Sequence, residues 1–152
     1  MLQAFSQEVN LGIYTGLGRV DYKSYPTIGG SFEYRIKKSY LSINVNPYFV
    51  FSEQKVHTTL PLYLKFIIGK QFRVSPLVGG FIRSGDRHGW EAGLEMEYLT
   101  VRKLMVFWRG EYMLDYYKDP WYAHSSQGSY YLDNEHSVWF SLGLKWRLLY
   151  KP

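Results

Sequence analysis

The stretch SVWFSLGLKWRLLY, residues 137–150, alternates two kinds of side chain with a period of two. Its odd positions include serine, glycine, lysine and arginine. Its even positions are all large and apolar: Val138, Phe140, Leu142, Leu144, Trp146, Leu148 and Tyr150. Because successive side chains of a β-strand point to opposite sides, the stretch predicts one long strand with an unbroken apolar face and a second face that is small and then cationic.

Seven more segments with the same period precede this stretch. Each sets large apolar residues on one face against glycine, small polar and charged residues on the other. Their ranges are 8–17, 27–36, 41–52, 56–68, 72–83, 90–98 and 104–115. No segment shows a helical period. The sequence therefore predicts an all-β fold of eight antiparallel strands, an even number that closes into an up-and-down barrel without a free edge.

The connections between these strands are expected to alternate between tight turns and longer loops. In chain order they are 18–26, 37–39, 53–55, 69–71, 84–89, 101–103 and 117–134. Bacterial outer-membrane barrels place their turns on the periplasmic side and their longer loops outside. Strands of about 10 residues also match the hydrocarbon thickness when tilted. We therefore expect a transmembrane barrel in the outer membrane, with both termini periplasmic.

The composition fits this interpretation and excludes several others. Aromatic residues make up 19% of the chain, and Tyr and Trp prefer the boundary between apolar and wet surroundings. There is no cysteine, and the net charge of +5 is spread out without a nucleic-acid-binding motif. We expect one domain, residues 8–152, behind an extension of residues 1–7 whose composition is compatible with a signal-peptide remnant.

The apolar face has two possible destinations. In a soluble lipid-carrying barrel it would line an internal cavity, whereas in a membrane barrel it would face lipid. Placing the strands alternately up and down sorts most apolar-face aromatics toward the strand ends, as in the two aromatic girdles of membrane barrels. Trp108, near the middle of its strand, is an exception. The pattern favours lipid, and the soluble carrier stays open as an alternative.

The opposite face carries glycines and charges of both signs, which suits the interior of an eight-stranded barrel with room only for side chains. Buried charges there must be paired and hydrogen-bonded. Strand register predicts that Glu95 lies opposite Arg109 and that Arg83 lies opposite Glu91. We expect a plugged lumen rather than a narrow pore. The expected charge network consists of Glu33, Arg35, Lys65, Arg83, Glu91, Glu95, Glu97, Arg109, Glu111, Lys145 and Arg147.

Prolines interrupt the pattern of three strands. Pro47, Pro61 and Pro76 each lack the backbone N–H that a strand ladder needs. Pro47 and Pro61 are expected to face each other across one hairpin, which predicts a bulge or frayed pairing there.

These features resemble the small eight-stranded outer-membrane proteins of the OmpX and OmpA membrane-domain type. The resemblance covers nearly the whole chain from Glu8 and is mainly architectural. Its one motif is an alternating apolar last strand with an aromatic near its end, matched by Phe140, Leu142, Leu144, Trp146, Leu148 and Tyr150. In that class the strand is read by the barrel-insertion machinery, so the resemblance implies this machinery as a partner during assembly. Lys151 and Pro152 after the aromatic depart from the motif.

Catalytic and metal-binding chemistry has few candidates. His124 and Ser126, with Glu135 behind them, are similar to the His-x-Ser pair of lipid A deacylases, but they fall within an expected loop rather than on a strand. All four histidines, His57, His88, His124 and His136, fall near the loop end without regular ligand spacing. We expect no catalysis, cofactor or metal, with the lipid-modifying enzyme as the alternative.

The sequence thus predicts a structural or accessory outer-membrane barrel with exposed loops. Its expected partners are outer-membrane lipids and the components of a larger envelope complex, and nucleic acid is not among them.

Overall fold

The computed structural model describes residues 7–20, 23–36, 39–53, 55–101, 103–118 and 132–151. Most of these residues are in strands. The strands are β1 (Gln7–Val20), β2 (Lys23–Arg35), β3 (Leu41–Val45), β4 (Tyr48–Phe51), β5 (Val56–Phe66), β6 (Ile68–Gly69), β7 (Phe72–Arg83), β8 (Arg87–Val101), β9 (Leu104–Lys118) and β10 (Leu132–Lys151).

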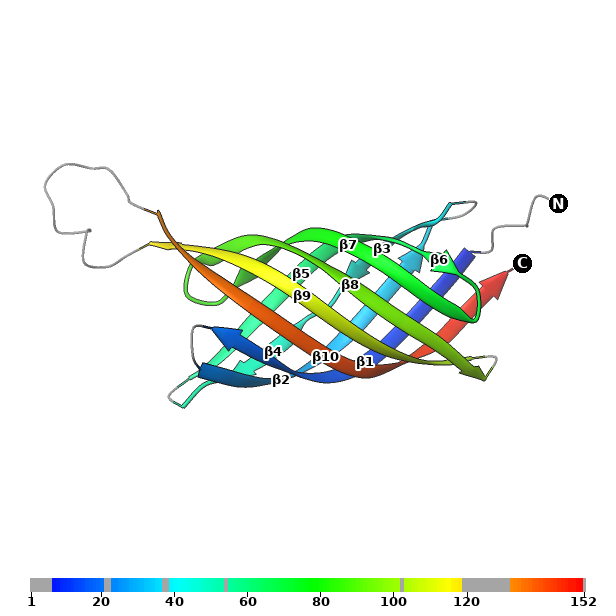
Figure 1. The fold of residues 1–152 in the computed structure, drawn as a ribbon, viewed down its shortest axis with the longest axis horizontal. Coiled ribbons are helices and arrows are strands. Elements are labelled where there is room, and N and C mark those ends of the chain that lie inside the picture. Colours follow the sequence, from blue (N-terminus) through cyan, green and yellow to red (C-terminus); the bar gives the residue numbers. More distant parts are fainter. Residues whose placement is uncertain are drawn as a thin grey trace, which may run out of the picture.

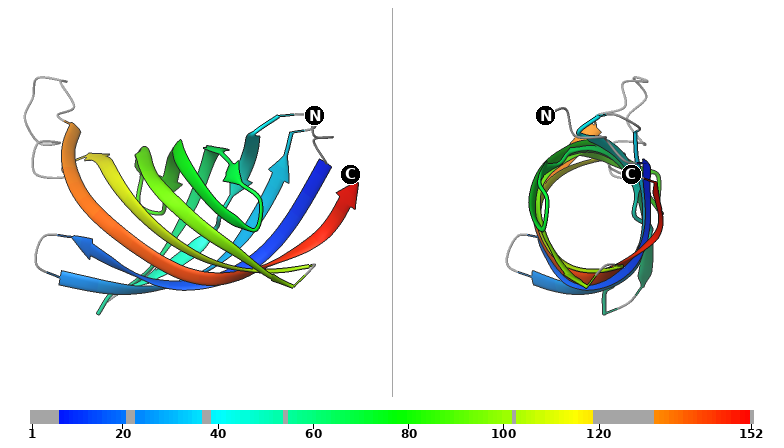
Figure 2. Two further views of the ribbon diagram at one scale, coloured as in Figure 1. Left: turned by 45° about the vertical axis from the view of Figure 1, so that its right-hand side comes forward. Right: turned by 90° about the vertical axis from the view of Figure 1, so that its right-hand side faces the viewer.

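Within the described residues, the ten strands correspond to the eight strand positions of a closed barrel. β3 and β4 are two parts of one barrel strand, and both pair with β2. β5 and β6 are two parts of another, and both pair with β7. Each barrel strand pairs antiparallel with the next in sequence, and β1 pairs with β10 to close the ring (Figure 1). The right-hand view of Figure 2 looks along the barrel and shows this ring. The predicted all-β, eight-stranded barrel is therefore confirmed.

The two ends of the barrel differ. The N- and C-terminal parts of β1 and β10 meet at one end, called here the terminal end (Figure 1). The opposite end carries the β1–β2, β4–β5, β7–β8 and β9–β10 connections and is called the loop end. No helix among the described residues is long and apolar enough to cross a membrane.

The apolar side chains point outward. Leu62, Leu94 and Leu142 are 55%, 41% and 56% exposed, whereas Glu95 and Arg109 on the opposite face are 0% and 1% exposed. The alternative of a soluble barrel with an apolar cavity is therefore wrong, because its interior would hold the leucines. The wall presents to its surroundings the kind of surface that only lipid or another apolar partner covers.

The barrel strand made of β3 and β4 is interrupted where proline was expected to disturb it. β3 ends at Val45 and β4 begins at Tyr48, which leaves Asn46 and Pro47 between them. The Pro47 carbonyl still accepts a hydrogen bond from the Gly30 N–H at 2.9 Å, but proline has no N–H to continue the ladder. The predicted irregularity is confirmed at this position, with Asn46 rather than Pro47 bonded across to Pro61.

Two connections at the loop end are tighter than the sequence suggested. β1 and β2 pair as far as Val20 and Lys23, and β7 and β8 pair as far as Arg83 and Arg87. The expected loops 18–26 and 84–89 are therefore wrong in extent. Gly18 indicated a loop, but it lies opposite Trp139 in β10, and a Cβ at Gly18 would lie 2.1 Å from the indole ring. The glycine serves close packing within a strand.

The tighter hairpin changes one predicted pairing. Glu95 lies opposite Arg109 as predicted. Arg83 lies opposite Arg87 instead of Glu91, because a shorter turn moves the partner residues along β8.

The last strand contains one irregularity. The β1–β10 register shifts between Val9 and Asn10, so that Val9 lies opposite Leu149 and Asn10 lies opposite Arg147. Phe140, Leu142, Trp146 and Leu148 are exposed on the outer wall, and Leu144 is half-buried. The side chain of Tyr150 lies outside the described residues.

Candidate functional site

The middle of the lumen holds an ionic group called here the central cluster: Glu33, Lys65, Glu95, Glu97 and Lys145. The ammonium group of Lys65 donates to Glu33 at 2.8 Å, to Glu97 at 3.2 Å and to Glu95. Lys145 donates to the same three carboxylates, at 3.0 Å to Glu33 and 2.6 Å to Glu97. Every side chain of the cluster is at most 1% exposed, so these pairs are held away from bulk water.

Arg109 joins the central cluster to the aromatic side chains above it. Its Nε donates to Glu95 at 2.7 Å, and its Nη1 lies 3.5 Å from a Glu111 oxygen. Its guanidinium carbon lies 5.2 Å from the ring centres of both Tyr63 and Phe107. The guanidinium group of Arg109 therefore donates hydrogen bonds to a carboxylate from its edge, while aromatic rings pack close to it.

Aromatic side chains fill the lumen toward the loop end. Tyr14 contacts Tyr48 and Phe107 edge to face, at 6.5 and 6.0 Å between ring centres, and Tyr48 contacts Trp139 at 5.7 Å. Gly143 makes room for this packing, because a Cβ there would lie 2.6 Å from the Phe107 ring. The buried residues of this group are called here the aromatic plug: Tyr14, Tyr48, Val50, Phe81, Phe107, Met113 and Trp139.

The loop end carries a second ionic group, the loop cluster. Arg83 is paired with Asp115, and Arg87 lies 3.1 Å from Asp115 and is also paired with Glu135. The Arg83 guanidinium packs 5.4 Å from the Trp139 ring centre. The two cations and two carboxylates of this cluster balance.

The terminal end carries a third group, the terminal cluster, built around Glu8. Its carboxylate accepts two hydrogen bonds from Arg73, at 2.9 and 3.1 Å. Arg147 lies 3.2 Å and Arg35 lies 3.8 Å from the same carboxylate. Asn10 donates to it at 3.0 Å.

Glu91 departs from the expected network. It is 0% exposed, and neither of its carboxylate oxygens has a hydrogen-bond partner. The expected charge pairing is therefore wrong for Glu91, because the shorter β7–β8 turn puts Arg83 beside Asp115 instead. The other expected members of the network lie on the lumen side and take part in the ion pairs described above.

A metal ion has one candidate position among the described residues. Glu33, Glu95 and Glu97 bring carboxylate oxygens within 4.8 Å of one another. The ammonium groups of Lys65 and Lys145 already bind these oxygens. The two lysines thus supply the positive charge that a metal would otherwise bring.

The histidines considered as ligands are dispersed where the structure describes them. The His57 Nδ1 lies 3.5 Å from the Ser84 hydroxyl, and the His88 ring lies 6.1 Å from the Tyr116 ring. His136 hydrogen-bonds Tyr112. His124 and Ser126 lie outside the described residues, and Glu135, their expected partner, pairs with Arg87.

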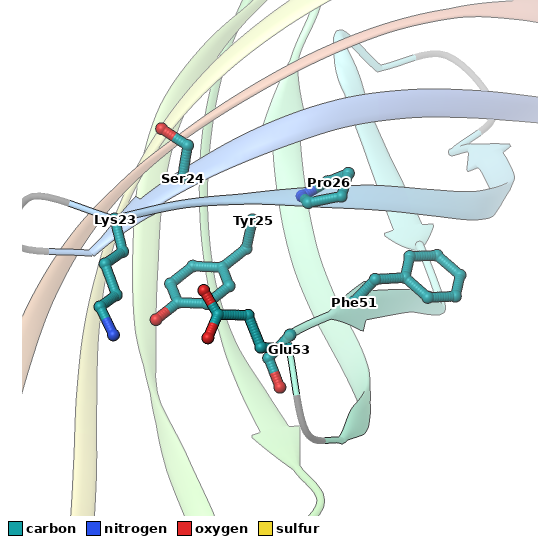
Figure 3. Close-up of a pocket in the computed structure, with 7 residues that line it drawn as sticks. Lys23, Ser24, Tyr25, Pro26, Phe51 and Glu53 are labelled. Atoms are coloured by element: carbon teal, nitrogen blue, oxygen red, sulfur yellow. The ribbon is translucent and has the colours of Figure 1, made fainter.

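Among the described residues, some of the hollows lie at the loop end. One, of about 200 Å³, is lined by residues that include His57, Arg83, Glu135 and Trp139. Another, of about 500 Å³, opens between the start of β2 and the β4–β5 hairpin. Figure 3 shows Lys23 to Pro26 on one side of it and Phe51 and Glu53 on the other. Both hollows are open rather than enclosed, and lysine and glutamate face the larger one together.

Sequence reasoning missed several members of the interior. Glu8, Arg73, Arg87 and Asp115 were not included in the expected network, although each forms an ion pair there. Glu8, Arg73 and Asp115 lie on the polar faces of their strands, so alternation alone would have identified them. Arg87 could not be found, because its segment was expected to be a loop.

Solved structures share this fold at low sequence identity. The N-terminal β-barrel domain of Pseudomonas aeruginosa OprF matches with a TM-score of 0.61 and 10% identity, over 93% of this chain and 99% of that one. Neisserial surface protein A matches with a TM-score of 0.59 and 10% identity, over 96% and 98% of the two chains. The fold is that of small outer-membrane barrels.

A third structure with this fold is Ail, the attachment invasion locus protein of Yersinia pestis, solved in complex with the heparin analogue sucrose octasulfate. It matches with a TM-score of 0.55 and 11% identity, over 96% of this chain and 100% of that one. No protein-family model matches the chain, and no curated protein matches it in sequence. The predicted resemblance to small outer-membrane barrels is therefore confirmed at the level of the fold.

Proposed function

We propose that this chain is a sealed barrel of the bacterial outer membrane, which acts as a structural or accessory protein rather than as a pore or an enzyme. The observation that carries the proposal is the combination of an apolar outer wall with a lumen filled by the central cluster and the aromatic plug. A filled lumen leaves the outer wall and the two ends as the surfaces available for interaction.

The outer wall supports a membrane location. Exposed aromatic side chains lie toward both ends of the barrel, with Phe72 and Tyr98 near the terminal end and Phe51 and Trp90 near the loop end. Such residues anchor a barrel at the two membrane interfaces. In the proposed orientation, the terminal end faces the periplasm and the loop end is displayed outside.

An accessory role is supported by the outer wall itself. Trp108 and Phe140 stack on the outside at 6.3 Å between ring centres and are 40% and 49% exposed. Trp108 lies away from both expected girdles, at a depth where lipid contact does not require an aromatic residue. A neighbouring membrane protein of an envelope complex would cover Trp108 and Phe140.

Conductance in a planar lipid bilayer tests the seal. The native chain is expected to insert without opening current steps. Removing the Phe107 and Trp139 side chains together (Phe107→Ala, Trp139→Ala) provides a matched control, because it takes two large rings out of the plug and leaves the outer wall unchanged. Regular current steps from the native chain would contradict the proposal.

Two further measurements test the location and the role. Membrane fractionation of cells that express the chain is expected to find it in the outer membrane. Purification in mild detergent is expected to recover a second envelope protein, and Trp108→Leu is expected to weaken that association. Altered lipid A masses in the expressing cells would instead favour the enzyme alternative.

A further inference from the structure

The pairing between β2 and β4 stops before the two hairpins end. Its last pair toward the loop end is Thr27 opposite Val50. β2 nevertheless begins at Lys23 and stays paired with β1 up to that residue, and β4 stays paired with β5 as far as Phe51. Among the described residues, the two hairpins therefore diverge here. The hollow of about 500 Å³ between them is called here the slot (Figure 3).

Proline explains why the ladder stops at this point. The Gly30 N–H donates to the Pro47 carbonyl, so the backbone groups of Gly30 face the barrel strand made of β3 and β4. Alternate residues of an antiparallel strand face the same neighbour, so Ile28, Pro26 and Ser24 face this side as well. Pro26 has no N–H to continue the ladder, and the pairing ends beside it.

Strand edges border the slot on both sides. The Ser52 N–H donates to the Lys55 carbonyl, toward β5, so the neighbouring Phe51 directs its backbone groups toward β2. If the register of β2 and β4 continued, Ser24 would lie opposite Glu53. Between these two described residues no such pair forms, and the N–H and C=O of Ser24 face the slot. Edges of this kind are templates for another extended segment.

The side chains around the slot carry charges of both signs. Lys23 lies on the β2 side and Glu53 on the hairpin side, and both are exposed (Figure 3). On the inner side, Tyr25 packs against the aromatic plug. The Phe51 ring faces outward and is 42% exposed. A segment in the slot therefore meets a cation on one side, an acid on the other and aromatic rings between them.

We propose that the slot binds an extended segment of a partner protein, which adds a strand between β2 and β4. The backbone of this segment bonds to the edge at Ser24, and its own charged side chains face Lys23 and Glu53. An acyl chain would leave the backbone groups of both edges without partners, so the slot suits a peptide rather than a lipid tail. The binding does not depend on the sealed lumen.

Titration of the native barrel in detergent with a capped synthetic peptide, TVEVTKV, tests the slot. Valine and threonine favour an extended backbone, and the glutamate and lysine complement Lys23 and Glu53. The chemical shift and the hydrogen exchange of the Ser24 amide are followed by NMR. Saturable binding that slows this exchange is expected, because the amide gains an acceptor.

Two substitutions at one position separate the backbone from the side chain. Ser24→Pro removes an N–H that faces the slot and leaves the bonds to β1 in place, so peptide affinity is expected to fall by roughly tenfold. Ser24→Ala is the matched control, because it removes the hydroxyl and keeps the backbone. Its effect is expected to stay within about twofold. Heat-dependent gel mobility checks that both variants are folded.

A modified peptide keeps the test independent of protein folding. With N-methyl groups on alternate residues, the same peptide loses the donors of one edge and is expected to bind the native barrel roughly tenfold more weakly. The proposal is overturned if the unmodified peptide does not saturate the barrel, or if Ser24→Pro and Ser24→Ala bind it equally. Protection of the Ser24 amide by a short-chain phosphatidylcholine or by a second barrel, and not by the peptide, also overturns it. Each of these results leaves the conductance test of the seal unaffected.

Discussion

The two halves of this lumen are filled by different chemistry. Toward the terminal end, two lysines share three buried glutamates, and every bond depends on a partner of opposite charge. Toward the loop end, between the central cluster and the ion pairs of the loop cluster, rings such as Tyr48, Phe107 and Trp139 fill the space by shape. The charges of the ionic half are neutralised only when all of its members are present, whereas the stability of the aromatic half depends on how well the side chains fill the available volume. Damage to the two halves should therefore differ in size and in kind.

The largest effect is expected where one shared carboxylate loses its charge. Glu95 accepts hydrogen bonds from Lys65, Lys145 and Arg109, so Glu95→Gln leaves three buried cations short of negative charge. Removing one partner of a buried ion pair costs about 3–5 kcal/mol of unfolding free energy. Urea titration of the barrel in lipid vesicles measures this loss.

Glu91→Gln is the matched control for this substitution. Both residues lie on the lumen side of β8 and are 0% exposed, but the Glu91 carboxylate has no hydrogen-bond partner. Neutralising Glu91 is therefore expected to leave the unfolding free energy unchanged or to raise it. Equal losses in the two variants would show that buried charge alone, and not its pairing, decides stability here.

A smaller effect is expected from overfilling the aromatic half. Gly143→Ala places a methyl group 2.4 Å from the Ile13 carbonyl oxygen and 2.6 Å from the Phe107 ring. Such crowding costs about 1–3 kcal/mol. Gly30→Ala is the control, because a Cβ there meets only the Gly12 carbonyl, at 3.8 Å. The same urea titration measures both, and a loss for Gly30→Ala as large as for Gly143→Ala would contradict the packing argument.

The smallest effect is expected from a single hydroxyl in the aromatic half. The Tyr48 hydroxyl donates to the Met113 sulfur, a weak acceptor, at 3.4 Å, and it accepts a long hydrogen bond from Arg83 at 3.4 Å. Tyr48→Phe keeps the ring and is expected to cost less than about 1 kcal/mol. A larger loss of unfolding free energy would mean that the aromatic half depends on hydrogen bonds as much as on shape.

Much of the fold could be predicted from alternation alone. The period of two in residues 137–150 separates the outward Leu142 from the inward Lys145, and the same rule placed Leu94 outside and Glu95 inside. Neighbouring strands then fix the pair Glu95 and Arg109 through a short turn. These predictions succeed because they use local sequence and the turn that joins two strands.

The contacts across the lumen could not be predicted in the same way. Lys145 of β10 meets Glu33 of β2 and Glu97 of β8 by reaching across the interior, and no turn relates these strands. Glu91 lost its expected partner because the β7–β8 turn is shorter than its glycines suggested. Alternation predicts which face of the sheet a residue occupies, whereas barrel curvature and side-chain length decide which residues it contacts there.

The joint between β1 and β10 has a consequence for how the barrel is made. Gln7 lies opposite Lys151, so the ring is completed by pairing the first described strand with the last. That contact has the greatest sequence separation in the sheet and the greatest entropic cost of formation. Until the final strand is synthesised, two unsatisfied backbone edges stay open to other chains. Before the barrel closes, these open edges therefore need protection from pairing with other chains, and the barrel itself does not yet provide it.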